Sequence, residues 1–167
     1  YTVLSNLGAW QSAATGEPLS IDALAGPRYM NTVGYGYTSF NDRRFEYGMN
    51  TWLGRTTYYT LHAPSVDQVL TSVMHSYETG YPTVVDEQER RGGPHFNNHS
   101  NSTFSHIMVV DSYDSSTGAV SFVDPGYTLW GGAQSIFWYP SLSTFTRTHL
   151  QNEVINDGKQ HIGIYTS

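Results

Sequence analysis

This sequence contains no cysteine, and Lys159 is its only lysine. Without cysteine, the 167 residues can form neither a disulfide framework nor a thiolate metal site. Only 13% of the residues are charged, where about 25% is usual for a soluble domain. The net charge of −6 and the lack of a basic run argue against nucleic acid as a partner. No apolar stretch reaches the roughly 20 residues that cross a membrane, so we expect no membrane partner.

Polar uncharged and aromatic side chains take the place of the missing charges. The chain has 13 tyrosines and 16 glycines, and serine, threonine and asparagine are abundant. A disordered chain shows the opposite bias, toward charge and away from aromatic residues. We therefore interpret the sequence as that of a folded, secreted protein. Its length suits one domain with a hydrophobic core, and it shows no internal repeat or linker, so we expect residues 1–167 to form a single domain.

Helical signals come first along the chain, and strand signals follow. Ser65 and Gln68 form a capping-box pattern ahead of apolar residues spaced by three and four, which predicts a helix ended by Gly80. Ser20 and Asp42 are the expected N-caps of two earlier helices. The expected helices are residues 2–13, 21–25, 43–53 and 66–79, and the expected strands are 55–62, 83–86, 107–110, 119–123, 135–139 and 160–165. This order is typical of an α+β domain.

Residues 87–105 read as a long polar loop, rich in asparagine, glycine, histidine and serine. Loops of this length inside a compact domain are usually functional or disordered. The loop has few apolar side chains and runs directly into His106. We therefore expect it to border a cleft as a mobile wall or lid.

His106 and Asp124 stand out because a β-hairpin would bring them together. His106 begins an apolar strand, Asp114–Gly118 has the composition of a turn, and Asp124 closes the next strand. Side chains that face each other in an antiparallel pair have Cβ atoms about 4.5–5.5 Å apart. An imidazole beside a carboxylate is the base and orienter of a nucleophilic triad. From the spacing alone, a structural His–Asp pair that pins the end of a hairpin is the favoured interpretation.

The segment Ser105–Gly126 resembles the His–strand–turn–strand–Asp-Pro block of C39-like cysteine peptidases. Three further motifs resemble that family in the same order along the chain: Ser20–Ala25 resembles its Ser-x-x-x-Leu-Ala helix, Met49–Gly54 its Leu-Asn-x-x-Leu-Gly helix end, and Gly80–Val85 its Gly-x-Pro strand entry. The resemblance covers most of the chain. It favours the catalytic interpretation of His106 and Asp124.

The resemblance implies a papain-like fold in which N-terminal helices pack on an antiparallel sheet. It also implies thiol-dependent hydrolysis of a peptide or protein substrate, with His106 as general base and Asp124 as its orienter. The family's nucleophile lies in a Cys-Gly-Pro-Ala motif that opens the first helix, and the matching position falls before Tyr1. The glutamine of the oxyanion hole would lie further upstream. The sequence as given therefore lacks the nucleophile, and a separate N-terminal segment is a possible partner that carries it.

Two other functions compete with the peptidase. The same fold could serve as a non-catalytic module that binds a peptide or cell-wall fragment. In either case we expect Trp130 and His99 to line the substrate cleft, although core packing of Trp130 is an equal alternative. A weaker alternative is a zinc-dependent hydrolase that uses His95, His99 and His106. No helix or strand is predicted to hold His95 and His99, so we expect no metal and no cofactor.

Overall fold

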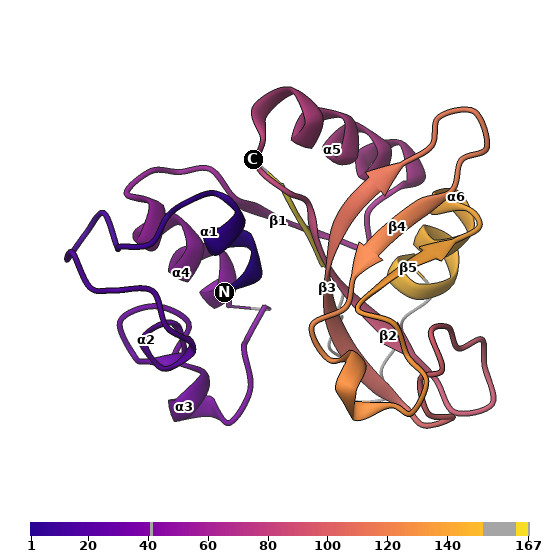
Figure 1. Ribbon diagram of the computed structural model, residues 1–167, viewed down its shortest axis with the longest axis horizontal. Coiled ribbons are helices and arrows are strands. Elements are labelled where there is room, and N and C mark those ends of the chain that lie inside the picture. The colour runs from indigo at the N-terminus through magenta and orange to yellow at the C-terminus, as the bar shows by residue number, and fades with distance from the viewer. Residues whose placement is uncertain (41, 152–162, 167) are drawn as a thin grey trace.

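The computed structural model describes residues 1–40 and 42–151, together with the backbone of 163–166. Helices occupy the first part of the chain and an antiparallel sheet the second, so the expected α+β class is confirmed (Figure 1). The helices are α1 (Thr2–Asn6), α2 (Ile21–Ala25), α3 (Thr32–Tyr35), α4 (Arg44–Leu53), α5 (Val66–Thr79) and α6 (Leu142–Phe145), with the helical turns η1 (Tyr127–Leu129) and η2 (Thr146–Gln151). The strands are β1 (Tyr59–His62), β2 (Val84–Glu89), β3 (Phe104–Tyr113), β4 (Val120–Val123), β5 (Ile136–Tyr139) and β6 (Gly163–Thr166). They form one sheet in the order β1-β6-β2-β3-β4-β5.

The sheet separates two hydrophobic cores. Val84 of β2 belongs to the core that contains α1 and α4, whereas its neighbour Val85 belongs to the core beneath α5, α6 and η2. Successive side chains of a strand point to opposite faces, so each face of β2 closes one core. Trp52 of α4 is fully buried in the first core and Phe145 of α6 in the second. The central strands are therefore covered on both sides.

Two polar side chains of α4 fix the chain that leads into β1. The Asn50 Oδ1 atom accepts hydrogen bonds from the backbone N–H groups of Thr57 and Tyr58, and its Nδ2 atom donates to the Tyr58 carbonyl. Glu46 accepts hydrogen bonds from the backbone N–H and the hydroxyl of Thr60. Backbone groups that have no helix or sheet partner are costly to bury, and these side chains satisfy them. Asn50 lies within the motif Met49–Gly54 and has a structural role there: it holds the backbone that leads into β1.

The structure corrects several expected boundaries. β2 continues to Glu89 and β3 already begins at Phe104, so the segment between them is 90–103 rather than 87–105. α1 ends at Asn6 instead of residue 13, and the N-cap position of α4 is Arg43, with Asp42 accepting a hydrogen bond from the Arg44 N–H. Sequence patterns also missed α3, α6 and η2. For the last expected strand, 163–165 lie in β6 and 160–162 lie outside the described residues.

The predicted capping box at the start of α5 is confirmed. The Ser65 Oγ atom accepts from the Gln68 N–H at 3.2 Å, and the Gln68 Oε1 atom accepts from the Ser65 N–H at 2.8 Å. Val69 and Val73 are buried as the periodicity predicts, but Met74 and Tyr77 lie 46% and 56% exposed, so the buried stripe is shorter than expected.

We expect Ser65→Ala to lower the free energy of unfolding by about 1 kcal/mol, because an N-terminal N–H of the helix loses its acceptor. The corresponding fall in melting temperature is about 2–4 °C for a domain of this size. Chemical and thermal denaturation followed by circular dichroism measure both quantities. Thr71→Ala, at an exposed position of the same helix, is the matched control and should leave the free energy of unfolding unchanged. Equal losses in the two variants would contradict a specific role for the cap.

Candidate functional site

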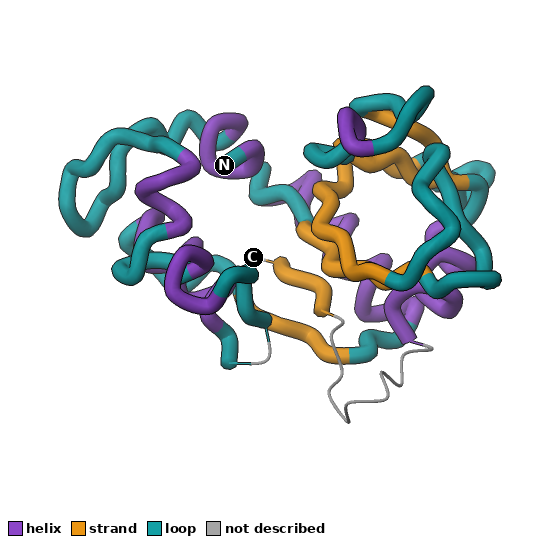
Figure 2. Tube along the Cα trace, turned by 90° about the horizontal axis from the view of Figure 1, so that it is seen from below, coloured by secondary structure: helices purple, strands orange, loops and turns teal. Residues whose placement is uncertain are grey.

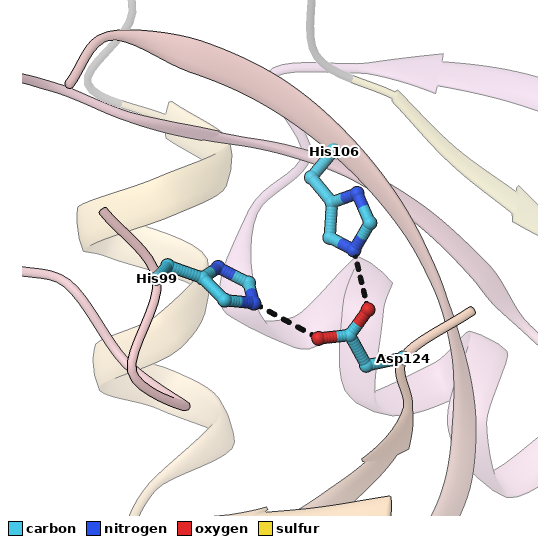
Figure 3. Close-up of side chains that lie close together, drawn as sticks. All are labelled: His99, His106 and Asp124. Carbon is cyan, nitrogen blue, oxygen red and sulfur yellow. Dashed lines mark hydrogen bonds and ion pairs between the residues drawn. The ribbon is translucent and has the colours of Figure 1, made fainter. Parts of the chain in front are cut away.

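His106 and Asp124 form the hydrogen bond that the hairpin geometry predicts. The β3–β4 register pairs Val109 with Val123, which places Asp124 one step beyond β4 and diagonally across from His106 on the same face. The Nε2 atom of His106 lies 2.7 Å from the Oδ1 atom of Asp124. Figure 3 shows the rings of His106 and His99 directed at the Asp124 carboxylate from two different segments of the chain.

Asp124 is completely buried and accepts four hydrogen bonds. Its Oδ1 atom accepts from His106 and from the Gly126 N–H at 2.8 Å. Its Oδ2 atom accepts from the Nε2 of His99 and from the Nδ2 of Asn97, each at 2.9 Å. Burial alone raises the pKa of this carboxyl, but the hydrogen bonds from His99 and His106 outweigh burial, and the net pKa is lowered. Asp124 is therefore ionised at neutral pH.

His99 connects Asp124 to a second buried carboxylate, that of Glu89. The Nδ1 atom of His99 bonds to Glu89 Oε1, and the other oxygen of Glu89 bonds to the Nδ1 atom of His95. The side chains of His99 and Glu89 are both fully buried. Burial lowers the pKa of the His99 imidazole, but the bonds to Glu89 and Asp124 more than compensate, so its pKa is raised. A continuous chain of hydrogen bonds thus runs from His106 through Asp124 and His99 to Glu89.

His106 has the properties of a neutral base. Burial lowers the pKa of its imidazole, and the opposing effect of Asp124 is smaller. With Nε2 donating to Asp124, the lone pair of the neutral ring lies on Nδ1, for which no hydrogen-bond partner occurs among residues 1–40 and 42–151. The side chain is 13% exposed. Nδ1 is therefore available to accept a proton.

Trp130 lies against both histidines. Its ring is tilted by 31° over His99 with 3.9 Å between centroids, and it meets His106 edge to face at 5.2 Å. The neighbouring Phe104 stacks on Trp130. Trp130 is partly exposed, so contact with a substrate stays a prediction for this residue.

Contrary to the prediction from the sequence, His99 is not positioned to contact a substrate. Its side chain has no exposed surface, and both of its ring nitrogens bond to carboxylates. We therefore correct the expected role of His99: the side chain lies behind Asp124 and holds it.

The structure also bears on the proposed zinc ligands. Two groups of described residues have donor atoms within 4.8 Å of one another: His99 with His106 and Asp124, and Glu87 with Glu89 and His99. The expected trio of His95, His99 and His106 is not such a group, because His95 bonds to Glu89 on the far side of His99. Hydrogen bonds within the network already engage both nitrogens of His99 and both oxygens of Glu89. We assign no metal to these side chains.

The middle of the segment 90–103 is anchored to the sheet, which argues against the expected mobile lid, whereas residues 90–94 and 100–103 are exposed. Phe96 stacks on Phe137 with 5.3 Å between ring centroids, and it also contacts Tyr139, Phe145 and His149. His99 is buried, and Asn97 bonds to Asp124. The segment is therefore anchored in the second core and supplies two partners of the site carboxylate.

Sequence analysis missed Glu89, Asn97 and Gly126 as members of the site. Glu89 ends a strand in which Asp86, Glu87 and Gln88 are also buried, and a run of charged and amide residues gave no signal for burial. The spacing of His95 and His99 suggested only a zinc site, and nothing in the sequence pointed to Glu89. Asp-Pro-Gly was recognised as a strand end, whereas the hydrogen bond of the Gly126 N–H became visible only in the structure.

Comparison with protein-family models and with curated proteins finds no match to this chain. Among the described residues, no helix is both long enough and apolar enough to cross a membrane.

Gly126 provides a steric test of the site. A Cβ atom at this position would lie 2.7 Å from Cε1 of His106 and 3.3 Å from the Trp130 ring. The backbone φ of −95° suits alanine, so the cost of Gly126→Ala is steric alone. We expect Gly126→Ala to displace the His106 ring from Asp124 and to lower the free energy of unfolding by about 1–3 kcal/mol.

Histidine ring NMR and denaturant unfolding measure these two effects. Gly131→Ala is the matched control, because a Cβ atom there meets nothing within 4 Å. An unchanged His106 spectrum in Gly126→Ala would show that the ring does not occupy this position in solution.

Proposed function

We propose that this chain belongs to a secreted, papain-like cysteine peptidase domain of the C39-like kind, which hydrolyses peptide bonds. The observation that carries this proposal is the hydrogen bond between Nε2 of the partly buried His106 and the buried Asp124, which leaves Nδ1 of His106 without a partner among the described residues. The attacking thiol would come from a residue outside the 167 residues given. His106 would be the general base and then the general acid, and Asp124 would orient it.

The arrangement of the two halves of the chain bears on this proposal. Val3 and Leu4 of α1 pack in the same core as Val109 of β3, whereas His106 shares the other face of β3 with Met108, so the thiol has to approach His106 around the end of the strand. Figures 1 and 2, which view the molecule from directions 90° apart, both place the N-terminal residue on the side of the helical part that faces the sheet.

The protonation states suit the reaction. A neutral His106 takes the thiol proton on Nδ1, and the thiolate attacks the carbonyl carbon of the peptide bond. The tetrahedral intermediate collapses to a thioester as His106 gives its proton to the departing amine. Water then attacks the thioester, His106 takes the water's proton, and the acid product leaves as the thiol is restored. Asp124 stays ionised throughout and stabilises the imidazolium that forms twice in each cycle.

The test uses the product of the complete gene. We expect it to contain a thiol that iodoacetamide alkylates near neutral pH, and to hydrolyse peptides. Removing the base with His106→Gln should reduce peptide turnover by about 10²–10⁴-fold, the usual contribution of general acid–base catalysis. Peptide cleavage is followed by mass spectrometry, and alkylation by intact mass.

His75→Gln is the matched control, since His75 is an exposed residue of α5 far from the pair in sequence. It should leave both rates unchanged. Equal alkylation and turnover rates in His106→Gln and the parent protein would exclude a thiol paired with His106. Saturable peptide binding without any turnover would favour the non-catalytic binding module instead.

A further inference from the structure

The hydrogen bonds of His99 determine its protonation state. An ionised carboxylate can only accept hydrogen bonds, so each contact of His99 with Glu89 and Asp124 needs an N–H on the imidazole. A neutral imidazole carries one N–H and an imidazolium carries two. Asp124 already accepts from four donors and is ionised. The contact with Asp124 therefore uses the Nε2–H of His99, and a proton on Nδ1 in the contact with Glu89 makes the ring an imidazolium between two buried carboxylates.

The surroundings of His99 are built for a cation without access to water. Trp130 covers one face of the ring at 3.9 Å, a distance at which an aromatic face attracts a positive charge. Phe96 and Phe104 close the remaining sides at 4.8 Å and 5.7 Å. The ionisable groups that face this space are Glu87 and Glu89 from β2, His106 from β3, Asp124 after β4, His95 from the segment 90–103 and His149 from η2.

The position of His99 affects His106 through Asp124. His99 and Asn97 hold Oδ2 of the carboxylate, so Oδ1 is left directed at the His106 ring. The centroids of the two imidazole rings are only 5.4 Å apart. A fixed positive charge at that distance opposes a second one on His106, whereas Asp124 alone would favour it.

We propose that His99 is the positioning residue of this site: a permanently protonated imidazolium, clamped between Glu89 and Asp124, that fixes the carboxylate and keeps the resting His106 neutral. The catalytic consequence of this clamp rests on the function proposed above. The clamp itself is a property of the described chain.

Histidine ring NMR on the ¹⁵N-labelled 167-residue chain tests the clamp without any thiol. At pH 7 we expect both ring nitrogens of His99 to be protonated, and His106 to be neutral with its proton on Nε2. His99→Gln removes the positive charge, so the titration midpoint of His106 should rise by about one pH unit, a tenfold gain in proton affinity. A single protonated nitrogen on His99 at pH 7, or an unmoved His106 midpoint, would overturn the proposal.

Two further variants provide a second test and a control. Glu89→Gln takes one carboxylate from His99 and should let it lose its second proton near neutral pH. The His106 midpoint should rise less than in His99→Gln, because the loss of the Glu89 charge opposes the rise. If circular dichroism shows that His99→Gln does not fold, the protonation of His99 in Glu89→Gln tests the proposal instead. His75→Gln, at an exposed position, should change neither His99 nor His106.

Peptide hydrolysis by the complete gene product separates positioning from a merely structural role. In a plot of kcat/KM against pH, His99→Gln should shift the acid limb to higher pH by the same one unit as the His106 midpoint. A uniform fall in rate without a shift of the limb would mark His99 as structural and overturn its positioning role. If the complete protein hydrolyses no peptide, the proposed function fails, and the NMR midpoints alone decide whether the clamp exists.

Discussion

The site depends on one buried carboxylate, that of Asp124. Removing an ionised carboxylate from water costs several kcal/mol unless hydrogen bonds replace its hydration. Here four donors do so, and they come from separate pieces of the chain: Asn97 and His99 from the segment 90–103, His106 from β3, and the Gly126 N–H from the turn after β4. The need to satisfy one anion therefore ties a long connection, a strand and a turn together.

β2 links this polar site to the hydrophobic cores. Its first residues, Val84 and Val85, close the two cores, and its last residue, Glu89, holds His99. Six consecutive register pairs with β3 fix the whole strand, so Glu89 and His106 are held on the same rigid pair of strands. Functional groups on paired strands keep their geometry better than groups on free loops. The segment 90–103 gains similar rigidity from Phe96, which packs into the second core.

Local patterns predicted what depends on neighbours in sequence. The α5 capping box and the His106–Asp124 contact both follow from short-range geometry, a helix N-terminus and a hairpin register. The buried polar end of β2 was not predictable in this way. Hydrophobic periodicity reports burial against apolar partners, whereas Glu89 is buried by pairing with His95 and His99. For the same reason, the polar composition of the predicted loop 87–105 favoured a mobile wall and gave no sign of the anchoring contact of Phe96.

The charges of the hydrogen-bonded network indicate how one site can hold a neutral base and still favour its cation during a reaction. In the proposed clamp, Asp124 and Glu89 contribute two negative charges and the His99 imidazolium one positive charge, so these three groups together carry one negative charge in excess. At rest, burial and the nearby His99 charge keep the pKa of His106 below its ordinary value. When His106 takes a proton, the excess is cancelled and Asp124 bonds to a full imidazolium. In this proposal the clamp sets the resting state of His106, and the excess negative charge stabilises its protonated state during the reaction.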